Sequence, residues 1–175
     1  MSRFGLREAQ MSDAEAIARA HTASWQTSYR GILPDTVLDR IDVGQRASSR
    51  RRIMEDRSIF QLVAYDFTHG DIVGFCDAGP SRRELPRFPR DTTGEVYAIY
   101  LVQHAKRHGL GQEMFESVMA YFSRNNVRQM VVWVLDNNDH ARRFYEALGG
   151  RESSRLQTRV GGFPVVEIAY VWDRF

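Results

Sequence analysis

The sequence contains a single cysteine, Cys76, among its 175 residues. One cysteine excludes an intrachain disulfide framework and a multi-cysteine zinc site, and it suits a reducing compartment. Because Cys76 lies in a predicted strand, we expect a buried and inert thiol, not a nucleophile. The fold must therefore be stabilised by its core, without covalent cross-links.

Long apolar runs are also missing from the sequence. Nowhere do 18 apolar residues follow one another, and no basic segment followed by an apolar stretch opens the chain. We find no internal repeat, no low-complexity tract and no linker rich in Ser, Gly or Pro. The sequence therefore predicts one domain over residues 1–175 in a cytoplasmic protein that does not interact with membranes.

Neither sign of charge dominates. The 24 basic and 22 acidic residues leave a formal net charge of +2, whereas a dedicated nucleic-acid binder carries a dense basic stripe. With 43% hydrophobic and 26% charged residues, the chain resembles an average soluble protein with one full-sized core. We expect small or mixed partners and no nucleic acid.

Hydrophobic patterning predicts seven strands and four helical regions. The strands are expected over residues 4–9, 59–65, 72–78, 95–102, 130–135, 156–160 and 165–172. Helices are expected after Ser12, between Pro34 and Asp56 with an interruption near Gly44, after Gly109, and after residues 136–139. Ser12 and Glu15 have the spacing of a capping box. This order of elements predicts a mixed α/β sheet.

Two features of the predicted helices are interpreted as surface. His21, on the first helix, is expected at the surface or at an edge of the fold. The run Arg50, Arg51, Arg52 is expected to be a solvated face and not a binding patch.

A basic loop with two glycines, Lys106 to Gly111, lies where a predicted strand passes to a helix. Exposed amide groups and the helix dipole can hold a phosphate there, although a plain turn before a helix is the alternative. About one G-x-G is expected by chance in a chain of this length. The loop lacks the Lys-Ser or Lys-Thr of a P-loop and the third glycine of a dinucleotide fingerprint, which disfavours nucleoside triphosphates and NAD.

Two blocks together carry a family resemblance. Residues 94–111, GEVYAIYLVQHAKRHGLG, resemble the acetyl-CoA-binding motif of the GNAT superfamily of acyl-CoA-dependent N-acyltransferases. Residues 132–149, VWVLDNNDHARRFYEALG, resemble the second motif of that superfamily. Residues 24–34 are similar to the substrate-side opening of one branch.

The resemblance implies an α/β (α+β) fold in a single domain. A mixed, mostly antiparallel sheet of about seven strands is expected, flanked by about four helices. A splay between the fourth and fifth strands would hold the cofactor.

The resemblance also implies that acetyl-CoA is the co-substrate and that no metal takes part. The loop amides would bind the pyrophosphate, and the strand and Asn138 would bind the pantetheine arm. The implied cofactor residues are Leu101, Val102, Arg107, His108, Gly109, Leu110, Gly111, Gln112 and Asn138. Lys106 replaces the usual Gln or Arg, so a side-chain contact there is in doubt. Gly150 replaces a common aromatic residue, which would open the floor beneath the last helix.

Acetyl transfer to an amine profits from an acid and a base, because an alkylammonium has a pKa near 10.4 and a thiol near 8.5. The resemblance implies that Tyr145 is the acid beside the sulfur; the alternative is a core aromatic with a satisfied hydroxyl. Glu95 and Tyr97 share a strand face by period-two alternation. Glu95 is the candidate base, with Tyr97 or water as alternatives and a solvated carboxylate as an equal option.

The acceptor side is expected to include Trp25, Tyr29 and Tyr97. The arginine-rich loop 82–90 either clamps an anionic acceptor or is solvated. The resemblance implies an N-acetyltransferase that moves the acetyl group of acetyl-CoA to a primary amine of a small molecule or peptide, by direct attack in a ternary complex. A catalytically silent CoA-binding sensor or interaction module is the alternative, and a homodimer is one option for assembly.

Overall fold

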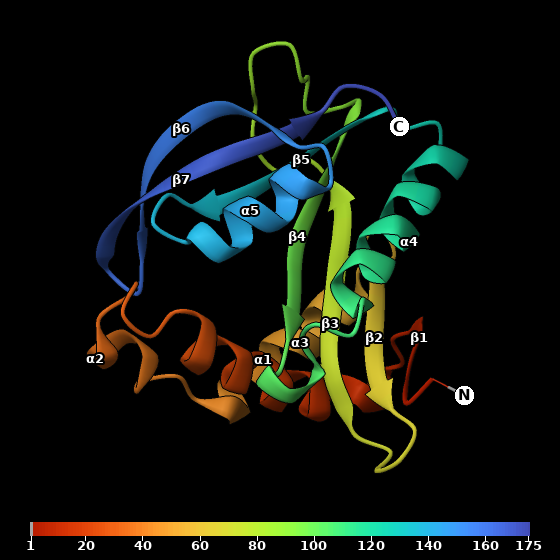
Figure 1. Ribbon diagram of the computed structural model, residues 1–175, viewed down its shortest axis with the longest axis vertical. Coiled ribbons are helices and arrows are strands. Elements are labelled where there is room, and N and C mark those ends of the chain that lie inside the picture. Colours follow the sequence, from red (N-terminus) through yellow and green to blue (C-terminus); the bar gives the residue numbers. More distant parts are fainter. Residues whose placement is uncertain (1) are drawn as a thin grey trace.

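A seven-stranded sheet organises the fold (Figure 1). The computed structural model describes residues 2–175, and in that part of the chain the strand order is β1-β2-β3-β4-β5-β7-β6. The strands are β1 (Phe4–Glu8), β2 (Phe60–Asp66), β3 (Ile72–Pro80), β4 (Thr93–Leu101), β5 (Gln129–Leu135), β6 (Arg151–Val160) and β7 (Phe163–Trp172). Only β4 and β5 pair in parallel; the other pairs are antiparallel. The predicted mixed sheet is confirmed.

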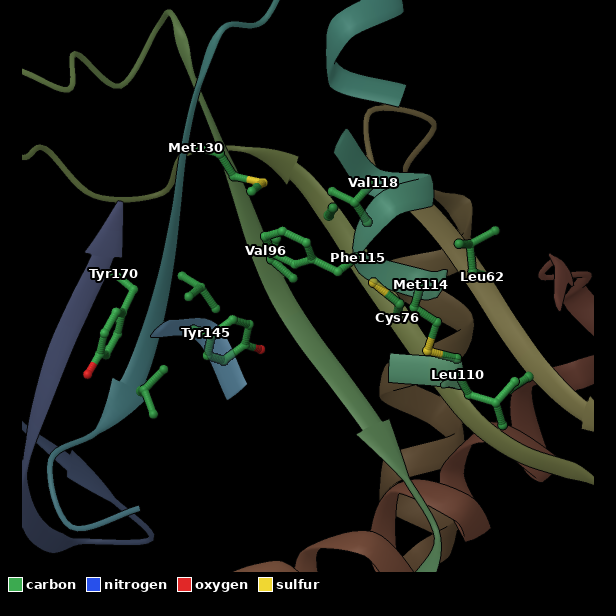
Figure 2. Close-up of a cluster of buried hydrophobic side chains, with 14 of the residues drawn as sticks. Leu62, Cys76, Val96, Leu110, Met114, Phe115, Val118, Met130, Tyr145 and Tyr170 are labelled. Atoms are coloured by element: carbon green, nitrogen blue, oxygen red, sulfur yellow. The ribbon is translucent and has the colours of Figure 1, made fainter. Parts of the chain in front are cut away.

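Helices cover both faces of this sheet. They are α1 (Ala14–Ser28), α2 (Asp35–Leu38), α3 (Val43–Glu55), α4 (Leu110–Arg124) and α5 (Asp139–Ala147), so residues 2–175 contain five α-helices where the sequence predicted four regions. Figure 1 shows α4 and α5 in front of the sheet and α1 and α3 behind it. The main core lies between the sheet and α4 with α5 (Figure 2). It includes Met114, Phe115 and Val118 of α4.

Two helix starts differ from the prediction. No capping box forms at Ser12, because a turn of 3-10 helix (Met11–Asp13) comes before α1. There Asp13 accepts a hydrogen bond from the backbone N–H of Gln10 at 2.7 Å. The second helical region breaks before Asp42, not at Gly44. The Asp42 carboxylate caps α3 by accepting from the Gln45 N–H at 2.6 Å.

The parallel pairing of β4 with β5 is short. Its register runs from Thr93 opposite Gln129 to Val96 opposite Val132, although both strands continue beyond these residues. The expected splay between the fourth and fifth strands therefore begins after Val96. A β-bulge in the β3–β4 register lies next to this point, between Asp77 and Ala78.

Arg50 is buried, contrary to the expectation of a solvated arginine run. It is 5% exposed, and its Nη1 donates to both oxygens of Asp77 on β3, at 2.8 and 2.7 Å. Its guanidinium also lies 4.5 Å from the centre of the Phe75 ring. Arg51 and Arg52 are exposed as predicted. The helical period turns only one of the three arginines toward the sheet, where Asp77 neutralises it.

His21 is partly buried in an aromatic cluster on the same face. Its ring stacks on Tyr100 at 5.2 Å and meets the edge of Phe75 at 4.9 Å. Burial lowers the pKa of His21 to about 3, and the nearby charges of Arg46 and Arg50 act in the same direction. The folded protein therefore keeps this imidazole neutral.

No helix within residues 2–175 is long and apolar enough to cross a membrane.

The buried ion pair predicts a large difference between neighbouring arginines. Arg50→Met leaves the Asp77 carboxylate buried and unpaired, which should lower the free energy of unfolding by about 3–5 kcal/mol. Arg51→Met is the control, because Arg51 forms only an exposed pair with Glu15, and it should cost under about 0.5 kcal/mol. Urea unfolding measures both values. Equal effects would show that the Arg50–Asp77 pair contributes no more than a surface pair.

The neutral His21 predicts a pH-dependent loss of stability. Below pH 6.5 the unfolded chain binds a proton at this imidazole that the folded chain does not bind, until the pH reaches about 3. The His21 contribution should therefore fall by about 1.4 kcal/mol per pH unit as the pH drops through this window. His21→Gln should remove that slope, whereas His104→Gln, at an exposed position, should keep it. Parallel slopes for wild type and His21→Gln would contradict the assignment.

Candidate active site

The edge of β4 that faces β5 lacks a strand partner beyond Val96. The Val102 N–H donates to the Val73 oxygen of β3 at 2.9 Å, so alternate residues of β4 direct their backbone groups toward β3. The backbone groups of Ile99 and Leu101 point to the other side, where β5 has diverged. The backbone groups of Leu101 can therefore pair with a ligand, as predicted, whereas the Val102 N–H is already bonded to β3. The sequence analysis did not name Ile99, because the side to which its backbone N–H and C=O groups point depends on the register between β4 and β3.

The glycine loop presents a row of backbone N–H groups at the start of α4. Among residues 2–175, the amides of residues 107–112 have no backbone acceptor. The chain bends through left-handed conformations at Arg107 (φ 65°) and Gly109 (φ 82°). A Cβ on Gly111 would lie only 3.3 Å from the Phe144 ring of α5. Unpaired amides and the positive end of a helix dipole form a binding site for a phosphate group.

The side chains of the glycine loop differ from one another in burial and in contacts. Arg107, His108 and Gln112 are exposed, whereas Leu110 is 2% exposed and anchors the loop in the main core. Lys106 does not extend toward the amides: its Nζ donates to the Ser28 hydroxyl at the end of α1, at 3.0 Å. Burial lowers the pKa of Lys106. In this geometry the Lys106 side chain is directed to Ser28 and not to the loop amides, in line with the doubt about a phosphate contact from this residue.

Asn138 and Tyr145 come from α5, beside the diverging strands. Asn138 caps the helix, and its Oδ1 accepts from the Ala141 N–H at 3.2 Å. Tyr145 is 6% exposed, and Figure 2 shows its hydroxyl pointing from α5 toward β4. No residue in the described range 2–175 forms a hydrogen bond with that hydroxyl. Burial raises the pKa of Tyr145, so the hydroxyl stays protonated and remains free to donate.

Gly150 does not open the floor beneath α5. A Cβ at this position would lie 2.7 Å from the Trp172 ring and 2.9 Å from the Tyr145 carbonyl oxygen. The indole of Trp172, whose Nε1 donates to the Leu148 carbonyl at 2.9 Å, fills the space expected to be open. The aromatic residue thus comes from β7, far away in the sequence.

The predicted base Glu95 is engaged by Arg82. It is 1% exposed; one oxygen accepts from the Arg82 backbone N–H at 2.8 Å, and the other from the guanidinium at 3.0 and 2.6 Å. The same guanidinium lies 4.1 Å from the centre of the Tyr97 ring. Tyr97 donates its hydroxyl proton to the Pro80 carbonyl at 2.5 Å, and burial raises its pKa to about 12.

The acceptor-side aromatics gather around a residue that sequence reasoning missed. The hydroxyls of Tyr29 and Tyr100 lie 3.0 Å apart, and Trp25 packs against Tyr29 with ring centres at 4.8 Å. The guanidinium of Arg46 covers the Trp25 ring at 4.8 Å. Trp25 lies in the last turn of α1 and is partly buried in this cluster. The position of Tyr100 within the 94–111 motif, directly before Leu101, was the available signal.

The arginine-rich loop is largely exposed, as one of its two expectations had it, but two apolar residues anchor it to the sheet. Leu85 and Phe88 are 5% and 4% exposed and pack on β5 and β7. Arg83 donates to Glu167 of β7 at 2.6 Å, just as Arg82 pairs with Glu95. Two of its arginines are therefore already neutralised by carboxylates.

Comparisons with known proteins agree with this geometry. Residues 16–150 match the model of the acetyltransferase (GNAT) family. A Bacillus subtilis protein described as uncharacterized N-acetyltransferase YuaI is 26% identical over 167 residues, which cover 95% of this chain and 91% of that protein.

Solved structures share the fold. The PaiA N-acetyltransferase of Thermoplasma acidophilum, in complex with coenzyme A, is 14% identical with a TM-score of 0.73 and covers 100% of both chains. The Salmonella typhimurium protein yncA, with its cofactor acetyl-CoA, is 17% identical with a TM-score of 0.71, over 98% of this chain and 94% of that one. The matched family segment contains the short β4–β5 pairing, the glycine loop and Tyr145. The chain therefore belongs to the acetyltransferase (GNAT) family, as an acetyl-CoA-dependent N-acetyltransferase.

Proposed function

We propose that this protein transfers the acetyl group of acetyl-CoA directly to a primary amine in a ternary complex. The observation that carries the proposal is the continuity of three features. The unpaired amides of residues 107–112 lie at the start of α4, the unpaired edge of β4 leads toward them, and the free hydroxyl of Tyr145 points to that edge. Together they match the three parts of an acyl-CoA: pyrophosphate, pantetheine arm and thioester.

The residues present fit acetyl-CoA. The loop amides donate to the pyrophosphate oxygens, and a glycine at 111 keeps the backbone close to the α5 helix, since a Cβ there would press on Phe144. The open backbone groups of Ile99 and Leu101 pair with the amides of the pantetheine arm, as an added strand would. Asn138, with its side-chain oxygen used as the α5 cap, keeps its amide protons for the same arm.

Bound acetyl-CoA supplies an activated carbonyl that an amine can attack, together with a thiolate leaving group. Tyr145 donates its proton to the departing sulfur, since burial keeps the hydroxyl protonated and no protein group competes for it. Proton transfer by a positioned side chain contributes about 10²–10⁴-fold to a rate. Backbone N–H groups of β4 polarise the carbonyl oxygen.

The acceptor approaches from the opposite face, beside the paired hydroxyls of Tyr29 and Tyr100. A direct attack requires the amine to reach the divergence of β4 and β5 from that side. Glu95 fits the role of base less well, because both of its oxygens already accept from Arg82. Water relayed to solvent is the simpler route for the amine proton.

A silent CoA-binding module is the competing function. Such a module would need the cofactor site but no proton donation from Tyr145. A buried tyrosine that serves only for packing normally has its hydroxyl hydrogen-bonded within the protein. The hydroxyl of Tyr145 is protonated and has no such partner, which favours the enzyme.

Acetyl-CoA binding tests the cofactor site. At 100 times its Kd the ligand adds about 2.7 kcal/mol to folding stability, which should raise the Tm by about 5–10 °C for a domain of this size. Gly109→Val should abolish the shift, because valine strains the left-handed backbone at φ 82°. Arg107→Gly is the control, since glycine also accepts φ 65° there. A full shift in Gly109→Val, or none in the wild type, would contradict the site.

Tyr145→Phe tests the acid. The variant keeps the ring in the core, so the acetyl-CoA shift should persist while kcat falls about 10²-fold or more on the best acceptor of an amine panel. Thiol release from acetyl-CoA measures the rate. Tyr121→Phe is the matched control, because Tyr121 lies on α4 and stacks on Phe60. Unchanged turnover in Tyr145→Phe would reduce this tyrosine to packing.

A further inference from the structure

The face of the sheet opposite α4 and α5 has two separate covers. Near Leu135 of β5 the cover comes from the segment after α1, through Leu33 and Leu38. Further along, Leu85 and Phe88 of the arginine-rich loop cover β5 and β7. The acceptor amine has to reach the sheet between these two covers, because the divergence of β4 and β5 lies there.

Glu167 of β7 occupies the place between the covers. Val165 packs in the first cluster and Ala169 in the second. Since side chains alternate along a strand, Glu167 points to the same face as both of them. Its register partner on β5 is Leu135, beyond the last residue of β5 that pairs with β4.

The carboxylate of Glu167 is only half used. One oxygen accepts from Arg83 Nη1 at 2.6 Å, and among residues 2–175 the other oxygen has no donor. The side chain is 17% exposed. Glu95 differs on both counts, because it is 1% exposed and its two oxygens are held by Arg82. Glu167 is therefore the carboxylate on this face that can take an additional hydrogen-bond donor.

Glu167 shares its strand face with Val165, which packs in the same cluster as Tyr29. Burial raises the pKa of Tyr29 well above its ordinary value, and Tyr100, Tyr145 and Glu167 add to the rise. Burial raises the pKa of Tyr100 as well, with Glu167 among the groups that add to it. One carboxylate thus influences both hydroxyls of the Tyr29–Tyr100 pair.

We propose that Glu167 binds the ammonium group of the acceptor through its free oxygen, beside the hydroxyls of Tyr29 and Tyr100. The proposal rests on the acetyl-transfer function proposed above and adds the form in which the acceptor is recognised. The acceptor arrives as a cation, held by one carboxylate and the aromatic faces around it. Arg83 fixes the carboxylate rotamer from the loop side and leaves one oxygen without a donor.

This recognition selects for amines and against neutral molecules of the same shape. A charge-assisted hydrogen bond in a partly buried site gives the ammonium an advantage of about tenfold or more in affinity. It also argues against the anionic acceptor that the four arginines of the loop first suggested, because Arg82 and Arg83 are taken by glutamates.

The test uses two probes of equal shape at pH 7, phenethylamine, which is cationic, and 2-phenylethanol, which is neutral. Their dissociation constants are measured by ligand-observed NMR on the full chain with saturating coenzyme A. The wild type should bind the amine about tenfold more tightly than the alcohol. Glu167→Gln should remove this preference and leave the affinity for the alcohol unchanged. Arg83→Met, which removes the ion pair and keeps the carboxylate, should retain the preference.

Three outcomes overturn the proposal: no preference in the wild type, a full preference in Glu167→Gln, or an equal loss in both variants, which would make Glu167 a structural partner of Arg83. The acetyl-CoA melting shift of Glu167→Gln should match the wild type and shows that this variant is folded. Because the probes are read without turnover, a failure of acetyl transfer is recognised separately, as the absence of thiol release from acetyl-CoA across the amine panel in the wild type.

Discussion

The short parallel pairing of β4 with β5 is the constraint on which the rest of the site depends. A parallel ladder that ends at Val96 leaves polar backbone groups of β4 without a partner inside the sheet. Such groups are costly unless a ligand or water satisfies them. An extended chain with amides of its own, such as a pantetheine arm, satisfies them in the manner of a strand. In the proposed complex the cofactor would complete the sheet.

Paired charges then determine what the remaining space accepts. Three arginines on the α1 face are each paired with a carboxylate: Arg50 with Asp77, Arg82 with Glu95, and Arg83 with Glu167. Arg46, whose guanidinium covers the Trp25 ring, forms no salt bridge with any residue in the range 2–175. In the proposed complex the three pairs would fix the side chains around the acceptor, and Glu167 keeps one oxygen without a donor.

The sequence predicted those parts whose signal is local. All seven strands have apolar residues at suitable spacing, although β6 begins at Arg151 and not at residue 156, because it is an edge strand held by pairing with β7 and mostly exposed. The glycine loop, Asn138 and Tyr145 were recognisable from the resemblance of residues 94–111 and 132–149 to two motifs of the family. Arg50 was not, because its burial depends on Asp77, 27 residues away. The side to which the backbone of Ile99 points depends on the register between β3 and β4, and the position of Glu167 depends on the register between β5 and β7. No single segment of the sequence encodes either register.

The bond between Lys106 and Ser28 joins the two halves of the site mechanically. Lys106 leads into the loop proposed to bind the pyrophosphate, and Ser28 ends the helix that carries Trp25. A ligand that displaces the loop must either break this bond or move the last turn of α1 with it. If the bond holds, occupancy of one half changes the affinity of the other, and thermodynamic linkage requires the effect to be equal in both directions. A single lysine side chain can thereby couple the binding of the two substrates.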